Sequence, residues 1–406
     1  MVSLLCAASF AELYLQSGPN CRLLSSCFNY QNRVSISFSL QLSCIAELLG
    51  FAWQSLVNKV RLIGLPRSVA WLHGPKAIAT TPTDAIVLCV LKDSENLVEA
   101  FIEHYLHLGF KHLFFLDNGS SDRTIERIRA HPHTTIVRST KPFRDYYVVF
   151  KNYLIQTFGA GHWCLIADVD EFLHLPLKQP LNKTLQYLNA NSYNVVCVQM
   201  LDVFSEEGVV LEKSDRIWSL SQLQETFKYY DVSDVSYRPY VRSFQPHVPQ
   251  GLRFAYGGIR QSVFNRNCFL TKEALLFIDE DHSFTWRKWA FGLGHLQSSH
   301  LLFSLPKNPI RLGDLSALFV HYKFIDSFYA ATQEAVVREN HWRGSQEYKA
   351  YQQVLVEHEG EQKQQGKQQT LNLKRSTAHV LDNVDKLIDQ GFLFVSDIFK
   401  REAQER

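Results

Sequence analysis

The 406-residue sequence is ordinary in composition, with 46 % hydrophobic and 20 % charged residues, and it is long enough for one large core or two smaller ones. Its formal net charge of +2 at pH 7 is too small to argue, from bulk charge, for nucleic acid or an anionic membrane as a partner. An anionic ligand must therefore be held by a local site, and the lack of a run of ~18 uncharged apolar residues predicts no transmembrane helix.

The first 80 residues are predicted to be an N-terminal extension, partly disordered or helical, because they show no strands bounded by turns. Between Ile45 and Ile63, apolar residues recur at helical spacing, with Lys59 and Arg61 on the polar side. Such a segment is typical of a packing helix or of a helix that lies on a membrane surface. Peripheral membrane contact through this extension is therefore one expectation.

Alternating strands and helices begin after the turn-forming residues 80–84. Strands are predicted at 85–90, 112–116, 135–137 and 163–167, with helices at 95–108, 123–130 and 145–157 between them. This alternation predicts parallel β-α units in an open α/β sheet, within a main domain that spans residues 81–330. Further strands are expected at 194–203 and 317–322, an inserted loop at 206–250, and a helical C-terminal region at 331–406.

The eight cysteines form no CxxC pair, which argues against a zinc site. Cys89, Cys164 and Cys197 lie in apolar, strand-like runs, where free cysteine packs as a small hydrophobic residue. This usage favours a reducing, cytoplasmic compartment.

Acidic residues follow three of the predicted strands: Asp93, Asp117, and the pair Asp168 and Asp170. Ligands of open α/β sheets bind at the carboxyl ends of strands, so these carboxylates are expected at one edge. In Asp168-Val169-Asp170 the two carboxylates lie on the same face of an extended segment and can reach one hard cation. Mg²⁺ and Mn²⁺ are typically held by one or two carboxylates plus substrate phosphates. A solvated turn or a helix cap is the alternative for such a short motif.

Five short motifs occur in a fixed order over about 90 residues. They are Lys92-Asp93-Ser94-Glu95, Glu103-His104-Tyr105, Leu108-Gly109, Asp117-Asn118-Gly119-Ser120-Ser121-Asp122 and Asp168-Val169-Asp170-Glu171-Phe172. In this order they resemble the family 2 glycosyltransferases with the A-type nucleotide-sugar fold, in the subgroup with a DxDEF motif. A weaker resemblance continues through Gly257-Gly258-Ile259-Arg260, Ser299-His300 and His321-Tyr322-Lys323. The chain departs from the pattern at Asp93-Ser94, at Phe101 and in the order of His104 and Tyr105.

The resemblance implies a Rossmann-like mixed sheet flanked by helices. It also implies transfer of a sugar from a nucleotide-diphosphate donor, UDP-linked, to the hydroxyl of a saccharide or other acceptor, with inversion. Carried over residue by residue, Asp117 and Asp93 would contact the base or ribose, and Arg260 and Lys323 the diphosphate. Asp168 would contact ribose or the metal, and Asp170 and His321 would bind the metal, which is Mn²⁺ or Mg²⁺; imidazole suits Mn²⁺ better.

An inverting transfer needs a base within hydrogen-bond reach of the acceptor hydroxyl. Glu171, Glu280 and Asp281 are the candidate carboxylates, and the sequence does not choose among them. Tyr229, Tyr230, Tyr237 and Tyr240 are either sugar-stacking residues or a plain loop cluster.

Other classes of protein fit this pattern less well. A non-catalytic nucleotide-sugar or carbohydrate-binding protein on the same fold would be expected to have lost metal ligands, but Asp168, Asp170 and His321 are present. A nucleotidyltransferase or a dinucleotide-binding oxidoreductase would need a glycine-rich loop after the first strand. The residues 92–95 in that position contain no glycine. Arg260 as a surface ion-pair partner and Asp122 as a helix cap are the plainer alternatives for those two residues.

Overall fold

The computed structural model describes residue 53 and residues 56–404, apart from 212–215, 241–247, 279–283, 289–293, 299–309, 339–341 and 366–369. Within these ranges, no helix has both the length and the apolar character that crossing a bilayer requires.

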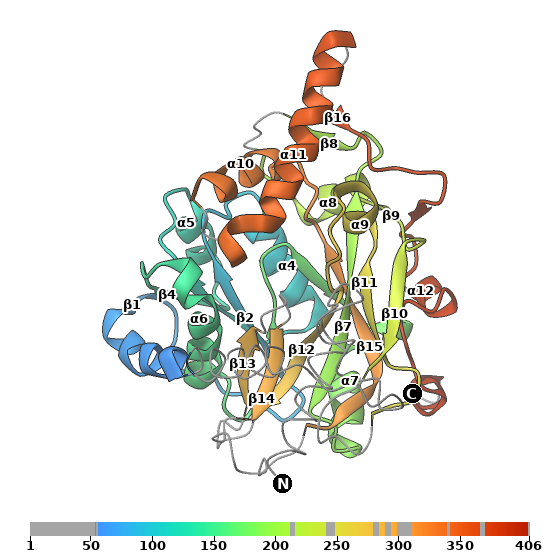
Figure 1. Cartoon of the computed structure of the whole chain (residues 1–406). Helices are drawn as coiled ribbons and strands as arrows, with labels where there is room; N and C mark the ends of the chain where they lie inside the picture. Colours follow the sequence, from blue (N-terminus) through green and yellow to red (C-terminus); the bar gives the residue numbers. More distant parts are fainter. Residues whose placement is uncertain are drawn as a thin grey trace, which may run out of the picture.

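A large mixed sheet forms the centre of the molecule (Figure 1). Its strands lie in the order β1-β4-β3-β2-β5-β12-β7-β15-β6. Their bounds are Ala70–His73, Thr134–Arg138, His112–Asp117, Ala85–Leu91, His162–Ile166, Thr271–Ile278, Val195–Phe204, Leu312–His321 and Glu171–His174. Strands β4, β3, β2 and β5 are parallel to one another, as the alternation of strands and helices predicts. β12 lies antiparallel between β5 and β7, so the expected mixed α/β sheet flanked by helices is confirmed.

Helices cover both faces of the sheet. All seven residues of β2 are buried because alternate side chains pack in opposite directions, Val87 into one hydrophobic cluster and Leu88 into another. The first cluster receives residues from α4, α5 and α7, and the second receives residues from α6. The bounds are Val98–Leu108 for α4, Thr124–Arg129 for α5, Phe143–Phe158 for α6 and Leu181–Ala190 for α7.

The helices of the C-terminal region pack in two places. Helices α10 (Phe328–Arg338) and α11 (Trp342–Gln365) form a separate hydrophobic cluster with α9 (Ile259–Phe264). Helices α12 (Lys386–Asp389) and α13 (Asp397–Gln404) return to the main core, where Leu387 and Phe399 are buried. Figure 1 shows α12 on the side of the molecule opposite β1.

The expectation of a loop at 206–250 is wrong for the described part of that stretch. It contains β8 (Val209–Val210), α8 (Leu220–Thr226), β9 (Tyr229–Tyr230) and β10 (Val235–Pro239). Ser219 and Gln222 form a capping box that starts α8. Tyr230 and Tyr240 are only 1 % and 4 % exposed, so these two rings belong to the core and are not free to stack on a sugar.

The remaining elements are η1 (Leu65–Ser68), η2 (Pro176–Lys178), β11 (Arg253–Gly257), β13 (Phe284–Lys288), β14 (Gly294–Ser298), β16 (Thr370–Leu371) and β17 (His379–Val380). Several of these strands pair outside the main path of the sheet, such as β11 with β10 and β13 with β14.

Candidate functional site

The candidate site lies at the edge of the sheet where the parallel strands end. Asp202 and His321 are opposite each other in the parallel pair β7 and β15, and His321 is also opposite Glu171 at the start of β6. Asp168 and Asp170 follow β5 along the same edge. The antiparallel β12 begins there, which brings Lys272 to the same place. The strand registers thus bring these charged residues to one edge of the sheet.

Three side chains form a cluster that could hold a cation. One ligand atom each from Asp170, Glu171 and His321 lies within 4.8 Å of the others in the described part of the chain. The Nε2 atom of His321 is 3.1 Å from Oδ2 of Asp170. Two of the three predicted metal ligands, Asp170 and His321, are therefore together. We refer to Asp170, Glu171 and His321 as the carboxylate–histidine cluster.

Asp202 orients His321 from the other side. Nδ1 of His321 donates to Oδ1 of Asp202 at 2.6 Å, and Nε of Arg260 donates to Oδ2 of Asp202 at 2.7 Å. Burial raises the pKa of Asp202, but Arg260 and His321 lower it more, so its pKa is held below the usual range. Metal-binding histidines commonly donate their second N–H to a carboxylate, which fixes the ring tautomer. Asp202 was missed from the sequence, although it stands near the end of a predicted strand, as the three predicted sites do.

Asp168 faces two lysines and lies outside the carboxylate–histidine cluster. Nζ of Lys151, a buried residue of α6, donates to Oδ1 of Asp168 at 2.9 Å, and Nζ of Lys272 is 3.7 Å from Oδ2. Burial raises the pKa of Asp168, but the attraction of Lys151 and Lys272 lowers it by more, so the pKa lies below its usual range. The side chain predicted to bind ribose or metal is thus already neutralised by protein cations.

Glu171, a candidate base, is 2 % exposed. One carboxylate oxygen pairs with Nζ of Lys272, and the other accepts from the backbone N–H of Asp168 at 3.0 Å. This second bond closes the Asp168–Glu171 turn, so Glu171 shapes the turn that presents Asp170.

The other candidate bases, Glu280 and Asp281, lie outside the described residues, as do Ser299 and His300. Ile278, which precedes the first two, pairs with His162 at the start of β5, at the opposite end of the sheet from Asp170.

Arg260 and Lys323 share a partner next to the cluster. Arg260 and Lys323 lie 3.7 Å and 3.9 Å from Oε1 of Glu347 on α11. Burial raises the pKa of Glu347, but Lys323 and Arg260 lower it to about 2. Both predicted diphosphate contacts are therefore near the site, and both are paired with carboxylates in this structure.

The loop after β3 is built around Asp117. Its carboxylate is fully buried, pairs with Arg138 and accepts the backbone N–H groups of Gly119 and Ser120 at 3.1 Å and 3.0 Å. Asp122 accepts from the N–H of Thr124 at 3.0 Å, which is a turn contact. The N-cap position of α5 is occupied by Arg123, so Asp122 is not the helix cap that was the alternative for it.

The loop after β2 is tied to the loop after β3. Oδ1 of Asp93 accepts from the N–H of Ser121 at 2.7 Å, and the N–H of Asp93 donates to the Ser120 hydroxyl at 2.9 Å. Asp93 itself has a positive φ of 46°, a conformation that is uncommon for a residue other than glycine. Asp93 and Asp117 lie at the same edge as Asp168, but both use their carboxylates to hold these loops.

His104 and Tyr105 support the strand that follows the metal motif. The Tyr105 hydroxyl donates to the carbonyl of Glu171 at 2.6 Å, and Nε2 of His104 donates to the carbonyl of Leu173 at 2.8 Å. Burial lowers the pKa of His104 to about 4, so its ring is neutral. Although their order differs from that of the family pattern, both side chains therefore hold β6 in place.

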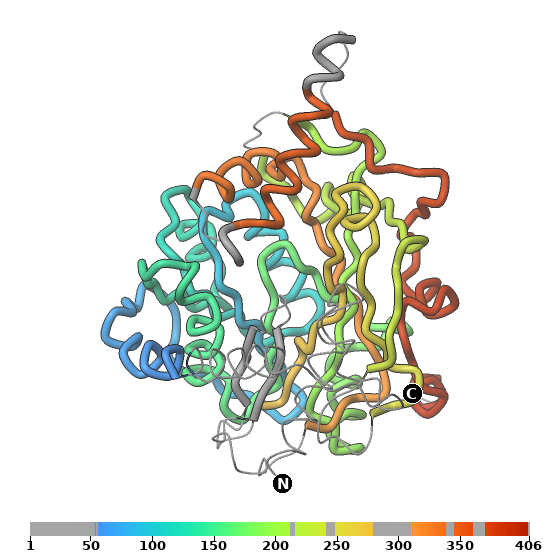
Figure 2. The backbone as a smooth tube through the Cα atoms, viewed as in Figure 1, coloured from blue at the N-terminus to red at the C-terminus, as the bar shows by residue number. Residues whose placement is uncertain are grey.

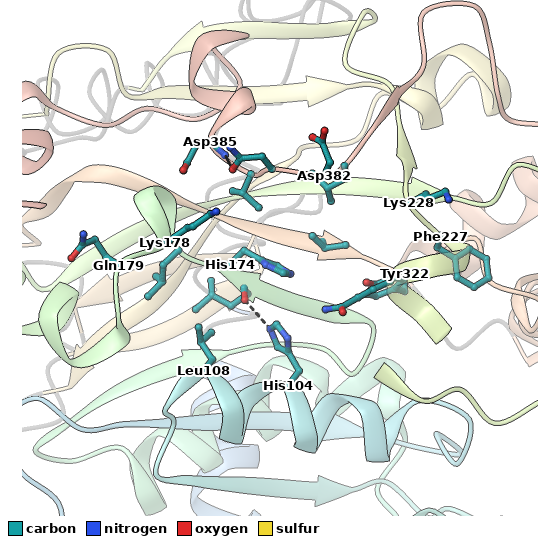
Figure 3. Close-up of a pocket in the computed structure, with 17 residues that line it drawn as sticks. His104, Leu108, His174, Lys178, Gln179, Phe227, Lys228, Tyr322, Asp382 and Asp385 are labelled. Atoms are coloured by element: carbon teal, nitrogen blue, oxygen red, sulfur yellow. Dashed lines mark hydrogen bonds between the residues drawn. The ribbon is translucent and has the colours of Figure 1, made fainter. Parts of the chain in front are cut away.

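A pocket of about 440 Å³ lies behind this strand (Figure 3). His104 and His174 line it together with Val320 and Tyr322, the residues on either side of His321. Because side chains alternate along a strand, His321 points away from this pocket. The pocket is therefore separate from the carboxylate–histidine cluster.

No model of a known protein family matches this sequence, and no curated protein matches it significantly. Among solved structures, it is similar to glucosyl-3-phosphoglycerate synthase from Mycobacterium tuberculosis in complex with Mn²⁺ and UDP, with 16 % identity, 29 % of this chain and 44 % of that chain covered, and a TM-score of 0.20. It is also similar to a mannosyltransferase from Pyrobaculum calidifontis in complex with GDP-Man and Mn²⁺, with 17 % identity and a TM-score of 0.22. That match covers 36 % of this chain and 44 % of the mannosyltransferase. A third similar structure is a UTP-bound UGPase from Acinetobacter baumannii, with 7 % identity and a TM-score of 0.21. That match covers 67 % of this chain and 82 % of the UGPase.

The chain thus spans less than half the length of either glycosyltransferase. At such TM-scores these likenesses carry no argument about activity, and the description of the fold rests on the strand order and registers given above.

Proposed function

We propose that this chain is a metal-dependent glycosyltransferase of the family 2 type, with the A-type fold and a DxDEF motif. It would move a sugar from a UDP-linked or other nucleotide-diphosphate donor to an acceptor hydroxyl, with inversion. The observation that carries the proposal is the carboxylate–histidine cluster at the edge where parallel strands end. The ordered motif pattern from Lys92 to Phe172 supports the same function.

The ligand types of the cluster fit a divalent cation. Asp170 and Glu171 offer the oxygen ligands that Mg²⁺ and Mn²⁺ prefer, and the imidazole of His321 favours Mn²⁺. Asp202 accepts the Nδ1–H of His321, which leaves Nε2 on the side of the cluster. When bound, the metal would neutralise charge on the diphosphate leaving group.

The charges around the cluster indicate why the donor would need that cation. Each of the four nearby cations is already paired: Lys151 with Asp168, Lys272 with Glu171, Arg260 with Asp202 and Lys323 with Glu347. Asp170 adds a fifth carboxylate to these four ion pairs. Among the residues that the structure describes here, these pairs leave no excess positive charge for a diphosphate, and a divalent cation would reverse that balance.

The chain's own residues would then position the donor. We propose that the linked loops of Asp93 and Asp117 contact the base and ribose through their exposed backbone and side-chain groups. Lys323 and Arg260 would reach the diphosphate by exchanging Glu347 for phosphate oxygens, since both side chains already bind an anionic partner there.

The experiment is donor turnover by the purified full chain with Mn²⁺ and a panel of nucleotide sugars, measured as released nucleotide. We expect metal-dependent release with at least one donor, and its loss in Asp170→Ala. If no donor is bound or hydrolysed in a metal-dependent way, the enzyme proposal fails. Binding without release would instead favour a nucleotide-sugar-binding protein.

The same assay separates the candidate bases. Glu171→Gln would weaken both metal affinity and turnover if Glu171 is a ligand, and kcat alone if it is the base. Glu280→Gln and Asp281→Asn are the matched comparisons, because a base at either position would lower kcat with metal affinity unchanged.

A further inference from the structure

The helix before β1 exposes an apolar stripe. Trp53, Leu56, Val60 and Ile63 are 67 %, 53 %, 62 % and 80 % exposed, and they account for four of the nine most exposed large hydrophobic residues in the described part of the chain. They are spaced three, four and three residues apart, and residues 56–64 are helical. This spacing places Leu56, Val60 and Ile63 along one face of the helix, and Trp53 stands at the position that continues the same spacing.

The opposite face of this helix is anchored to the protein. Leu62 packs against the hydrophobic cluster that contains α6, and Leu65 just beyond is buried within it. The Arg61 guanidinium lies 3.5 Å from Asp145 and stacks over the ring of Tyr146, both in the first turns of α6. The helix is therefore held in a fixed orientation with its apolar stripe outward, and Figure 2 shows this blue segment at the margin of the molecule.

The sequence around the stripe is basic. Residues 53–83 contain four basic residues, Lys59, Arg61, Arg67 and Lys76, and no acidic residue. Lys59, Arg67 and Lys76 are exposed. Because the whole chain has a net charge of only +2, this is a local concentration of charge and not a property of the protein as a whole.

We propose that this helix docks on an anionic lipid surface, with Trp53, Leu56, Val60 and Ile63 inserted between headgroups. An apolar face flanked by lysine and arginine is the composition that binds the interface of a bilayer, where the basic side chains meet anionic headgroups. A tryptophan at one end of the stripe suits the boundary between headgroups and acyl chains. Since insertion uses an existing outward face, the enzyme would not need to unfold to bind.

This placement has a consequence for the candidate site. The α6 helix that anchors the stripe through Asp145 also carries Lys151, which contacts Asp168. Through α6, the docking helix is therefore connected to the candidate site. The docking proposal does not depend on the proposed transferase function and stands or falls on lipid binding alone.

The test is sedimentation of the full chain with vesicles of phosphatidylcholine alone or with about 30 % phosphatidylserine. We expect binding to the anionic vesicles that weakens with salt, and a loss of about tenfold or more in Val60→Glu/Ile63→Glu. Val337→Glu on α10 is the matched control, because Val337 is 82 % exposed far from this helix in sequence and should leave binding unchanged. Lys59→Glu/Arg67→Glu should remove the preference for phosphatidylserine, whereas Lys183→Glu should not.

Trp53 reports the depth of insertion. Brominated lipids should quench part of the fluorescence of the wild-type chain, and that part should be missing in Trp53→Phe. No anionic binding, or binding that Val60→Glu/Ile63→Glu leaves intact, would overturn the proposal. A dimer in light scattering that the double variant makes monomeric would also overturn it, in favour of a second copy as the occupant.

Discussion

The edge of the sheet that carries the candidate site has two halves, and they use carboxylates differently. In the half formed by β3 and β2, Asp117 and Asp93 bind backbone N–H groups and a guanidinium, so their carboxylates hold loops. In the half formed by β5, β7 and β15, Asp170, Glu171 and His321 converge on one point. Both halves place acids at strand ends, and in both a carboxylate holds the backbone, as Glu171 does in the second half. The meeting of Asp170 with His321 is what distinguishes the second half.

The largest expected effect separates the two halves by metal affinity. His321→Ala removes the nitrogen ligand, and we expect Mn²⁺ affinity to fall by more than about 100-fold, beyond the range of outer-shell changes. Asp117→Asn, in the other half, should leave Mn²⁺ affinity within about twofold. Calorimetric titration measures both, and a comparable loss in the two variants would mean that the halves are one unit.

A smaller effect is expected for the residue that orients His321. Asp202→Asn should weaken Mn²⁺ binding by about 10- to 100-fold, because the imidazole loses the carboxylate that fixes its tautomer. Asp314→Asn is a matched control: Asp314 is also buried on β15, but it binds Tyr187 and Ser396. Equal losses in both variants would indicate general destabilisation, and not orientation of the ligand.

Metal affinity should also depend on pH. Burial lowers the pKa of His321, but Asp170 and Asp202 raise it more, so the metal-free imidazole stays protonated above its ordinary pKa of 6.5. Metal must displace this proton, so affinity should fall about tenfold per pH unit below the pKa and level off above it. In Asp202→Asn the pH at which metal affinity levels off should be lower, because the variant lacks one carboxylate that raises the pKa of His321. A profile unchanged between the two proteins would contradict the contact.

The smallest effect on metal binding is expected in the loop half, where the cost should appear as lost stability. Asp117→Ala leaves Arg138 and the N–H groups of Gly119 and Ser120 without their acceptor. We expect a loss of about 1–3 kcal/mol in the free energy of unfolding, measured by urea denaturation. Full stability with weakened metal binding would reverse the assignment of the two halves.

The sequence was enough to locate this edge and much less sufficient to assign its contacts. Strands such as β2 and β5 were predictable because their apolar runs and strand-ending acids are local signals. The ion pair between Lys272 and Glu171 was not, since it depends on β12 inserting antiparallel between β5 and β7, which joins residues 101 positions apart. Asp168 lies outside the cluster because it pairs with Lys151 on α6. No pattern in the sequence indicated that this lysine is buried.

The most direct test of the metal site is pulsed electron paramagnetic resonance of Mn²⁺ bound to the full chain. The carboxylate–histidine cluster predicts modulation from one directly bonded imidazole nitrogen, absent in His321→Gln and retained in a control such as His174→Gln. Bound Mn²⁺ with no nitrogen modulation, or with modulation that survives His321→Gln, would place the metal elsewhere and contradict the account.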